Sequence, residues 1–113
     1  MEKETFNLIN QERIQAGLNP IIWDENLHSG ARSWSETMQI KGNLYHDVSG
    51  VNTQYFAECI YGASWSRYRT PEQSVEAWMN SSGHRTILMG AYRIGAVGIA
   101  KNNGFWATYR CKK

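Results

Sequence analysis

The sequence predicts an α+β fold, with helices packed against an antiparallel sheet, and three observations carry this prediction. Helical patterns come first, near residues 2–16, 24–42 and 70–80, and a hairpin pattern follows at 94–111. No linker or internal repeat interrupts the 113 residues, which suffice for one hydrophobic core but not for two. We therefore expect a single domain over residues 1–113.

The first helix is predicted over residues 2–16. Its apolar face includes Ile9 and Ile14, and Arg13 lies outside that face. Gly17 stands where a left-handed residue commonly ends a helix.

The second helix is predicted to begin after Asp24, a residue that suits the N-cap position, and to end at Gly42. His28 lies beside its apolar stripe, so we expect a solvated helix residue there. The stripe consists of Leu27, Ala31, Trp34 and Met38.

An irregular segment follows from residue 43 to 69, with one short strand near 57–61. Irregular stretches of this length in small domains are usually functional. Thr70-Pro71-Glu72-Gln73 then carries the signals of a helix start, with a capping threonine, a proline in the first turn and a glutamine that completes a capping box. That helix ends at Ser81-Ser82-Gly83, and a short helical turn is expected near 85–89.

The chain closes with a predicted β-hairpin around Asn102-Asn103-Gly104, since Asn-Gly favours the left-handed turn geometry. Gly95 and Gly98 leave the first of its strands thin, so we expect something bulky to pack on it. On the second strand, alternate residues point to opposite faces. One face carries Phe105, Ala107, Tyr109 and Cys111, and the other carries Trp106, Thr108 and Arg110.

Charge and hydropathy exclude some classes of function. Twelve Lys and Arg against ten Asp and Glu give a net charge of +2, without the basic stripe that nucleic-acid binding normally needs. No apolar stretch approaches the ~18 residues of a membrane span. Met1-Glu2-Lys3-Glu4 is not a signal peptide and is expected to start a helix of a mature or excised domain.

Four polar residues are candidates for a functional site: His46, Glu58, Glu76 and His84. Glu58 lies in an apolar run, so we expect it to be partly buried, and it then needs a hydrogen-bonding or charged partner or must carry a raised pKa. The chain reversal at 81–83 can bring His84 back toward Glu76. Two histidines and two glutamates in one cleft would form a transition-metal site or an acid–base site, but spacing alone leaves their convergence open.

The two cysteines, Cys59 and Cys111, lack the close spacing of a metal site. Their positions leave two alternatives open: one disulfide, or two buried free thiols.

Several motifs resemble the CAP superfamily, also called SCP/TAPS, and its short bacterial branch in particular. The most specific is Val75-Glu76-Ala77-Trp78-Met79-Asn80-Ser81-Ser82-Gly83-His84-Arg85, which is similar to the signature helix and turn of the family. Asn10-Gln11-Glu12-Arg13, Ala57-Glu58-Cys59-Ile60-Tyr61-Gly62 and Gly95-Ala96-Val97-Gly98 resemble further family segments, so the resemblance covers nearly the whole chain.

The resemblance implies an α-β-α sandwich with a central antiparallel sheet flanked by helices. It also implies a cleft that holds His46, Glu58, Glu76 and His84, in which the two histidines bind zinc or another divalent ion, with weak affinity. Cys59 stands where the family has Asn. On the family fold it would lie on the sheet that Cys111 ends, which makes a Cys59–Cys111 disulfide the preferred expectation and places the domain outside the cytoplasm.

Three functions follow from the resemblance. The first is a secreted or cell-surface binding module, assumed monomeric, that takes a metal and a peptide, lipid or cell-wall fragment, with Tyr61 and Trp65 as apolar contacts. The second is a metal-dependent hydrolase, similar to a peptidase, in which Glu58 or Glu76 acts as general base. The third is an interaction domain whose four polar residues only hold chain segments together.

Overall fold

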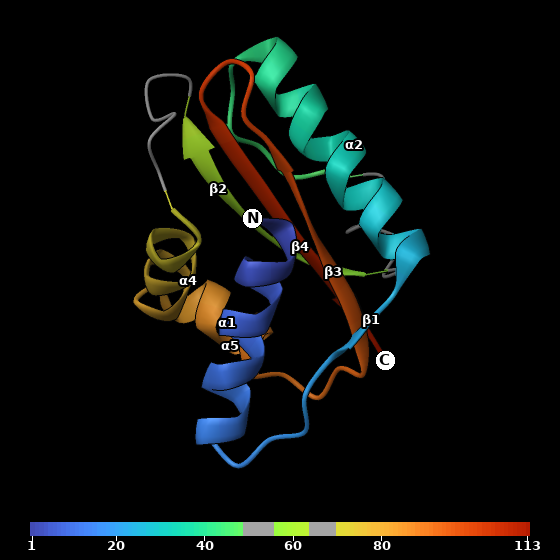
Figure 1. Cartoon of the computed structure of the whole chain (residues 1–113), viewed down its shortest axis with the longest axis vertical. Helices are drawn as coiled ribbons and strands as arrows, with labels where there is room; N and C mark the ends of the chain where they lie inside the picture. Colours follow the sequence, from blue (N-terminus) through green and yellow to red (C-terminus); the bar gives the residue numbers. More distant parts are fainter. Residues whose placement is uncertain (49–55, 64–69) are drawn as a thin grey trace.

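The computed structural model describes residues 1–48, 56–63 and 70–113. Within them, a four-stranded sheet lies between two helical layers (Figure 1). The elements in chain order are α1 (Glu2–Gln15), β1 (Ile22–Trp23), α2 (Glu25–Lys41), β2 (Ala57–Ala63), α4 (Pro71–Met79), α5 (Ser82–Leu88), β3 (Ile94–Ala100) and β4 (Phe105–Lys112). The predicted α+β class is confirmed.

The sheet has the strand order β1-β3-β4-β2. β4 pairs antiparallel with both β3 and β2, as the hairpin pattern predicts. The short β1 pairs parallel with β3, Ile22 opposite Ile94, so the sheet is mixed and this edge adds one parallel pair to the predicted antiparallel strands. Parallel neighbours need a long crossover connection, and the chain between β1 and β3 supplies it with three described helices and a strand.

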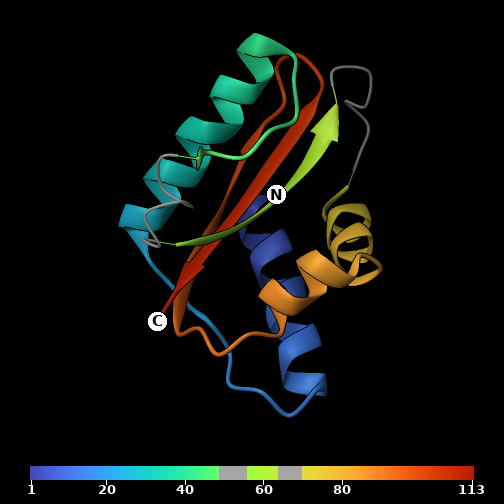
Figure 2. The same ribbon diagram turned by 180° about the vertical axis from the view of Figure 1, so that it is seen from behind.

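The two helical layers are unequal. Of the helices in the described residues, α2 covers one face of the sheet, lying along β3 and β4, and α1, α4 and α5 cover the other face (Figures 1 and 2). The predicted caps are confirmed: Asp24 accepts a hydrogen bond from the Leu27 N–H at 2.9 Å, Gly42 has a φ of 69°, and Thr70 and Gln73 form the capping box.

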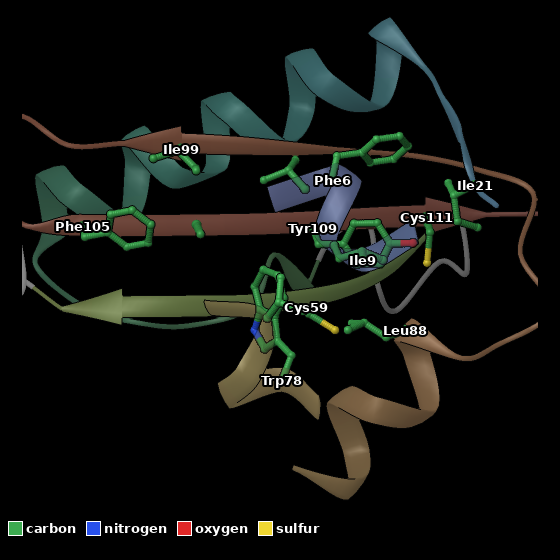
Figure 3. Close-up of a cluster of buried hydrophobic side chains, with 13 residues drawn as sticks. Phe6, Ile9, Ile21, Cys59, Trp78, Leu88, Ile99, Phe105, Tyr109 and Cys111 are labelled. Carbon is green, nitrogen blue, oxygen red and sulfur yellow. The ribbon is translucent and has the colours of Figure 1, made fainter. Parts of the chain in front are cut away.

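Both faces of β4 are buried because helices cover both sides of the sheet. The face toward α1, α4 and α5 joins the main hydrophobic cluster (Figure 3). The other face lies under α2, and there Thr108 and Ser35 of α2 share a hydrogen bond of 2.7 Å. The predicted alternation of β4 is therefore confirmed on both sides.

The thin part of β3 is filled by the backbone of α2. A Cβ placed on Gly98 would lie 2.1 Å from the Arg32 nitrogen and 2.4 Å from the Ala31 carbonyl carbon. Ser35 donates to the Gly98 carbonyl at 2.9 Å and holds the helix at this distance. Glycine at position 98 thus lets α2 lie directly on the sheet.

The predicted apolar face of α1 is wrong at two positions. Ile14 is 59% exposed, whereas Arg13 is only 2% exposed. Arg13 donates to the carbonyls of Asn19, Leu88 and Gly90, each at 2.8 Å. The arginine is buried because it satisfies carbonyls of the α1–β1 connection and of the end of α5, and helical periodicity does not predict such distant partners.

The expected Cys59–Cys111 disulfide is not present: both residues are buried free thiols (Figure 3). Strand register supplies the reason. Cys59 lies opposite Tyr109 and Cys111 lies opposite Ala57, so the two cysteines are diagonal neighbours on one face of the sheet. Diagonal neighbours lie roughly 7–8 Å apart, with their Cβ atoms somewhat closer, whereas a disulfide requires Cβ atoms roughly 4 Å apart.

His28 is more enclosed than the sequence predicts. Its ring lies 2.9 Å from a Glu2 carboxylate oxygen and 3.3 Å from one of Glu25, and its side chain is 21% exposed. Glu2 also accepts from the Ile99 N–H at 2.9 Å. His28 therefore helps tie α1 to α2 and to β3. In the described ranges, no helix has the length and apolarity to cross a membrane.

Candidate functional site

The candidate site is built around Glu58, whose side chain is fully buried on β2. One carboxylate oxygen, Oε1, lies 2.9 Å from Nδ1 of His46 and accepts from the Asp47 N–H at 3.1 Å. The other, Oε2, accepts from Nε of Arg110 at 2.9 Å. The prediction that Glu58 is buried and partnered is confirmed.

Arg110 and Asp47 are members of this network that the sequence reasoning missed. Arg110 lies directly opposite Glu58 in the β2–β4 register, and its Nη2 donates to Asp47 Oδ2 at 3.0 Å. Its guanidinium also lies 4.1 Å from the ring centre of Phe56. A signal was available: Arg110 occupies an inward position on a strand predicted to be covered, and a charge there requires a buried partner.

The network determines which atom of His46 faces outward. Glu58 accepts from Arg110 and from a backbone N–H and therefore acts as a carboxylate, which can only accept. The proton of the His46–Glu58 hydrogen bond must then sit on His46 Nδ1, and Nε2 carries a lone pair when the ring is neutral. The His46 side chain is 45% exposed, so this nitrogen belongs to a surface-accessible ring.

His84 lies in the first turn of α5, on the face of the sheet that α2 does not cover. Its Nδ1 is 3.0 Å from the Ser81 hydroxyl, and its backbone carbonyl accepts a weak hydrogen bond from the Cys59 thiol at 3.7 Å. Burial lowers the pKa of His84 below its usual value of 6.5, and the charge of His46 lowers it further. Both segments contact β2, an edge strand of the sheet: the His46 ring bonds to Glu58, and the His84 carbonyl accepts from Cys59.

Glu76 does not join the network. It is exposed on α4, and within the described part of the chain no hydrogen bond or ion pair connects its carboxylate to His46, Glu58 or His84. The same residues contain no cluster of three or more His, Cys, Asp or Glu side chains suited to hold a metal ion.

The two aromatic candidates differ in what the structure says of them. Tyr61 is half-buried against the main cluster, and its ring centre lies 6.4 Å from that of Phe105 in an edge-on arrangement. This contact gives Tyr61 a packing role. Trp65 lies outside the described residues.

The fold and this histidine–carboxylate pair define a class of protein: an α-β-α sandwich with a polar network at the β2 edge of the sheet. The chain belongs to the CAP family, the cysteine-rich secretory protein family, whose sequence model matches residues 6–111.

The relatives agree with this assignment. The protein YkwD of Bacillus subtilis is 32% identical over 93% of this chain, which covers 44% of YkwD. The chain thus spans less than half the length of that relative.

Solved structures of low identity show the same fold. An extracellular protein with an SCP domain from Bacillus anthracis has a TM-score of 0.80 at 21% identity, with 99% of this chain and 40% of that chain covered. An outer surface protein of Borrelia burgdorferi has a TM-score of 0.74 at 17% identity, with 98% and 91% covered.

Proposed function

We propose that this domain is an extracellular binding module that takes a divalent metal ion, zinc in the first place, between His46 and His84. The observation that carries the proposal is the Glu58 carboxylate, which is hydrogen-bonded to His46 Nδ1 at 2.9 Å. Metal-binding histidines commonly donate their second ring nitrogen to a carboxylate in this way, which fixes the ring and leaves the other nitrogen as a ligand.

His84 supports the proposal from the second side. Its lowered pKa favours the neutral imidazole near neutral pH, and a histidine must be neutral to bind a metal. Two imidazoles leave the other positions of a tetrahedral zinc ion for water or for a ligand group. Because zinc sites usually have three or four protein ligands, we expect weak affinity here.

The descriptions of similar proteins support the extracellular part of the proposal. One structural neighbour is described as an extracellular protein and another as an outer surface protein. We propose that the bound partner is a peptide, a lipid or a cell-wall fragment.

The experiment is calorimetric titration of the purified domain with zinc. Wild type should bind, and His46→Ala and His84→Ala should each abolish the heat. His28→Ala is the matched control, since His28 is engaged with Glu2 and Glu25 and should leave binding intact. No heat in wild type, or binding that survives both His46→Ala and His84→Ala, would refute the metal site and favour the purely structural role of these residues.

The hydrolase alternative now depends on Glu76. Both oxygens of Glu58 are occupied by donors, so this carboxylate is poorly suited to take a proton from water. Peptide cleavage with zinc should disappear in Glu76→Gln if the domain is a hydrolase. Equal cleavage by both proteins would point to a contaminating enzyme.

A further inference from the structure

Arg110 is the one cation in the described residues that contacts both acidic groups beside His46. Its side chain is 7% exposed, and it donates to Glu58 Oε2 through Nε and to Asp47 Oδ2 through Nη2. The planar guanidinium can hold two carboxylates in fixed directions, which a lysine ammonium cannot do. Arg110 therefore constrains both the strand residue and the segment that carries His46.

Two further contacts hold the guanidinium in place. The ring of Phe56 lies 4.1 Å from it on one side. On the side of α2, a Cβ added to Gly30 would lie 2.7 Å from Nη1 of Arg110. Figure 1 shows α2 lying across β3 and β4, and Gly30 is where the helix leaves room for the arginine.

The contacts form a chain that ends at His46. Arg110 occupies Glu58 Oε2, which turns Oε1 toward His46 Nδ1. Asp47, the next residue, is held twice: its N–H donates to Glu58 Oε1 and its carboxylate accepts from Arg110. Arg110 and Glu58 together thus hold both the backbone and the ring of this short segment.

We propose that Arg110 is a positioning residue, which acts through Glu58 and Asp47 to hold His46 with its proton on Nδ1 and its Nε2 directed to a ligand. This deepens the proposed function and rests on it only for the identity of the ligand, because the orientation of the ring is a property of the metal-free protein.

The test measures the ring nitrogens of His46 by long-range proton–nitrogen NMR of the metal-free domain at about pH 8, above the ordinary histidine pKa. In wild type, the proton should reside on Nδ1. Arg110→Lys keeps a positive charge beside Glu58 but loses the planar guanidinium that contacts both carboxylates. In this variant the His46 signals should shift toward the mixture of tautomers typical of a free imidazole, with the proton mainly on Nε2. The zinc dissociation constant should rise about 10- to 100-fold, the usual effect of removing such supporting contacts.

Gly30→Ala is the second variant, because it retains every charge and displaces only the guanidinium. It should shift the same His46 signals in the same direction. Arg93→Gln removes an exposed positive charge and should leave them unchanged. His28 is an internal reference in each spectrum, since its partners are Glu2 and Glu25.

The outcomes are separable. If Arg110→Lys and Gly30→Ala both fold, by the dispersion of their amide spectra, and His46 keeps the wild-type pattern, the positioning role of Arg110 is refuted. If wild type binds no zinc but the His46 signals move as expected, Arg110 positions His46 and it is the proposed metal function that fails.

Discussion

Replacement of Gly98 by alanine tests how closely α2 approaches the sheet. The added Cβ would lie 2.1 Å from the backbone nitrogen of Arg32, whereas ordinary contacts begin at 3.4 Å. The obstacle is helix backbone and cannot rotate away, so α2 would have to withdraw by about 1.3 Å, the difference between those two distances.

That displacement has a calculable cost. It would lengthen the hydrogen bonds of Ser35 to the Gly98 carbonyl and to Thr108, now 2.9 and 2.7 Å. Each is worth about 1 kcal/mol, and overpacking a core costs about 1–3 kcal/mol. We expect Gly98→Ala to lower the free energy of unfolding by about 3–5 kcal/mol, or the Tm by about 12–20 °C at roughly 4 °C per kcal/mol for a chain of this size.

The assay is thermal unfolding followed by circular dichroism, with Gly83→Ala as matched control. Gly83 lies on α5, and an added Cβ there meets no atom within 4 Å. This variant should be neutral or gain up to about 1 kcal/mol from the higher helix propensity of alanine. A Gly98→Ala protein whose Tm lies within about 4 °C of wild type would refute the close approach of α2.

Three further predictions concern an arginine, a histidine and two cysteines on the other side of the sheet. Arg13→Met should lower the free energy of unfolding, measured in urea, by about 3 kcal/mol. Hydrogen bonds to a charged group contribute about 1.5–3 kcal/mol, and the carbonyl acceptors would be left buried without their donor. A loss below about 1 kcal/mol, the range of exposed substitutions, would contradict the structural role of Arg13. The pKa of His84 in the folded protein lies below 6.5, so the unfolded chain binds the proton more readily. The free energy of unfolding should therefore fall as the pH drops below 6.5. In urea titrations at several pH values, His84→Gln should show a smaller dependence on pH than wild type. Burial raises the pKa of Cys59 far above 9.0 and that of Cys111 to about 12. The native protein should therefore react slowly with a thiol reagent at neutral pH, and its stability should fall as the pH rises above 9.0. Rapid labelling of both thiols without unfolding would contradict this prediction.

Local signals predicted most of the fold because each depends on neighbours in sequence. Asp24 and Thr70 cap helices through bonds to residues three positions along, and both bonds are present. The alternation along β4 depends only on strand geometry, and it correctly separated the two buried faces. Such features need no knowledge of the rest of the chain.

Features that depend on distant segments could not be predicted in the same way. Arg13 is buried because it reaches carbonyls 75 and 77 residues away, and the partner of Arg110 is 52 residues away. The cysteine pairing failed for a related reason: both residues lie on the expected face, but the register of β2 against β4 sets them diagonally. The sequence indicates which face of a strand a residue lies on, whereas the register determines which residue of the neighbouring strand lies opposite it.

The site follows the same division. The resemblance to the family placed His46 and Glu58 together, and a hydrogen bond of 2.9 Å joins them. What family motifs do not contain is the support behind that pair, which comes from Arg110 of β4 and the gap at Gly30 of α2. Gly30 lies immediately before the helix residues that rest on Gly98, so one close approach of α2 both seals the sheet and encloses the guanidinium. The contacts that orient the His46 ring therefore depend on how closely α2 packs against the sheet, so the proposed binding site and the stability of the fold rely on the same helix–sheet contact.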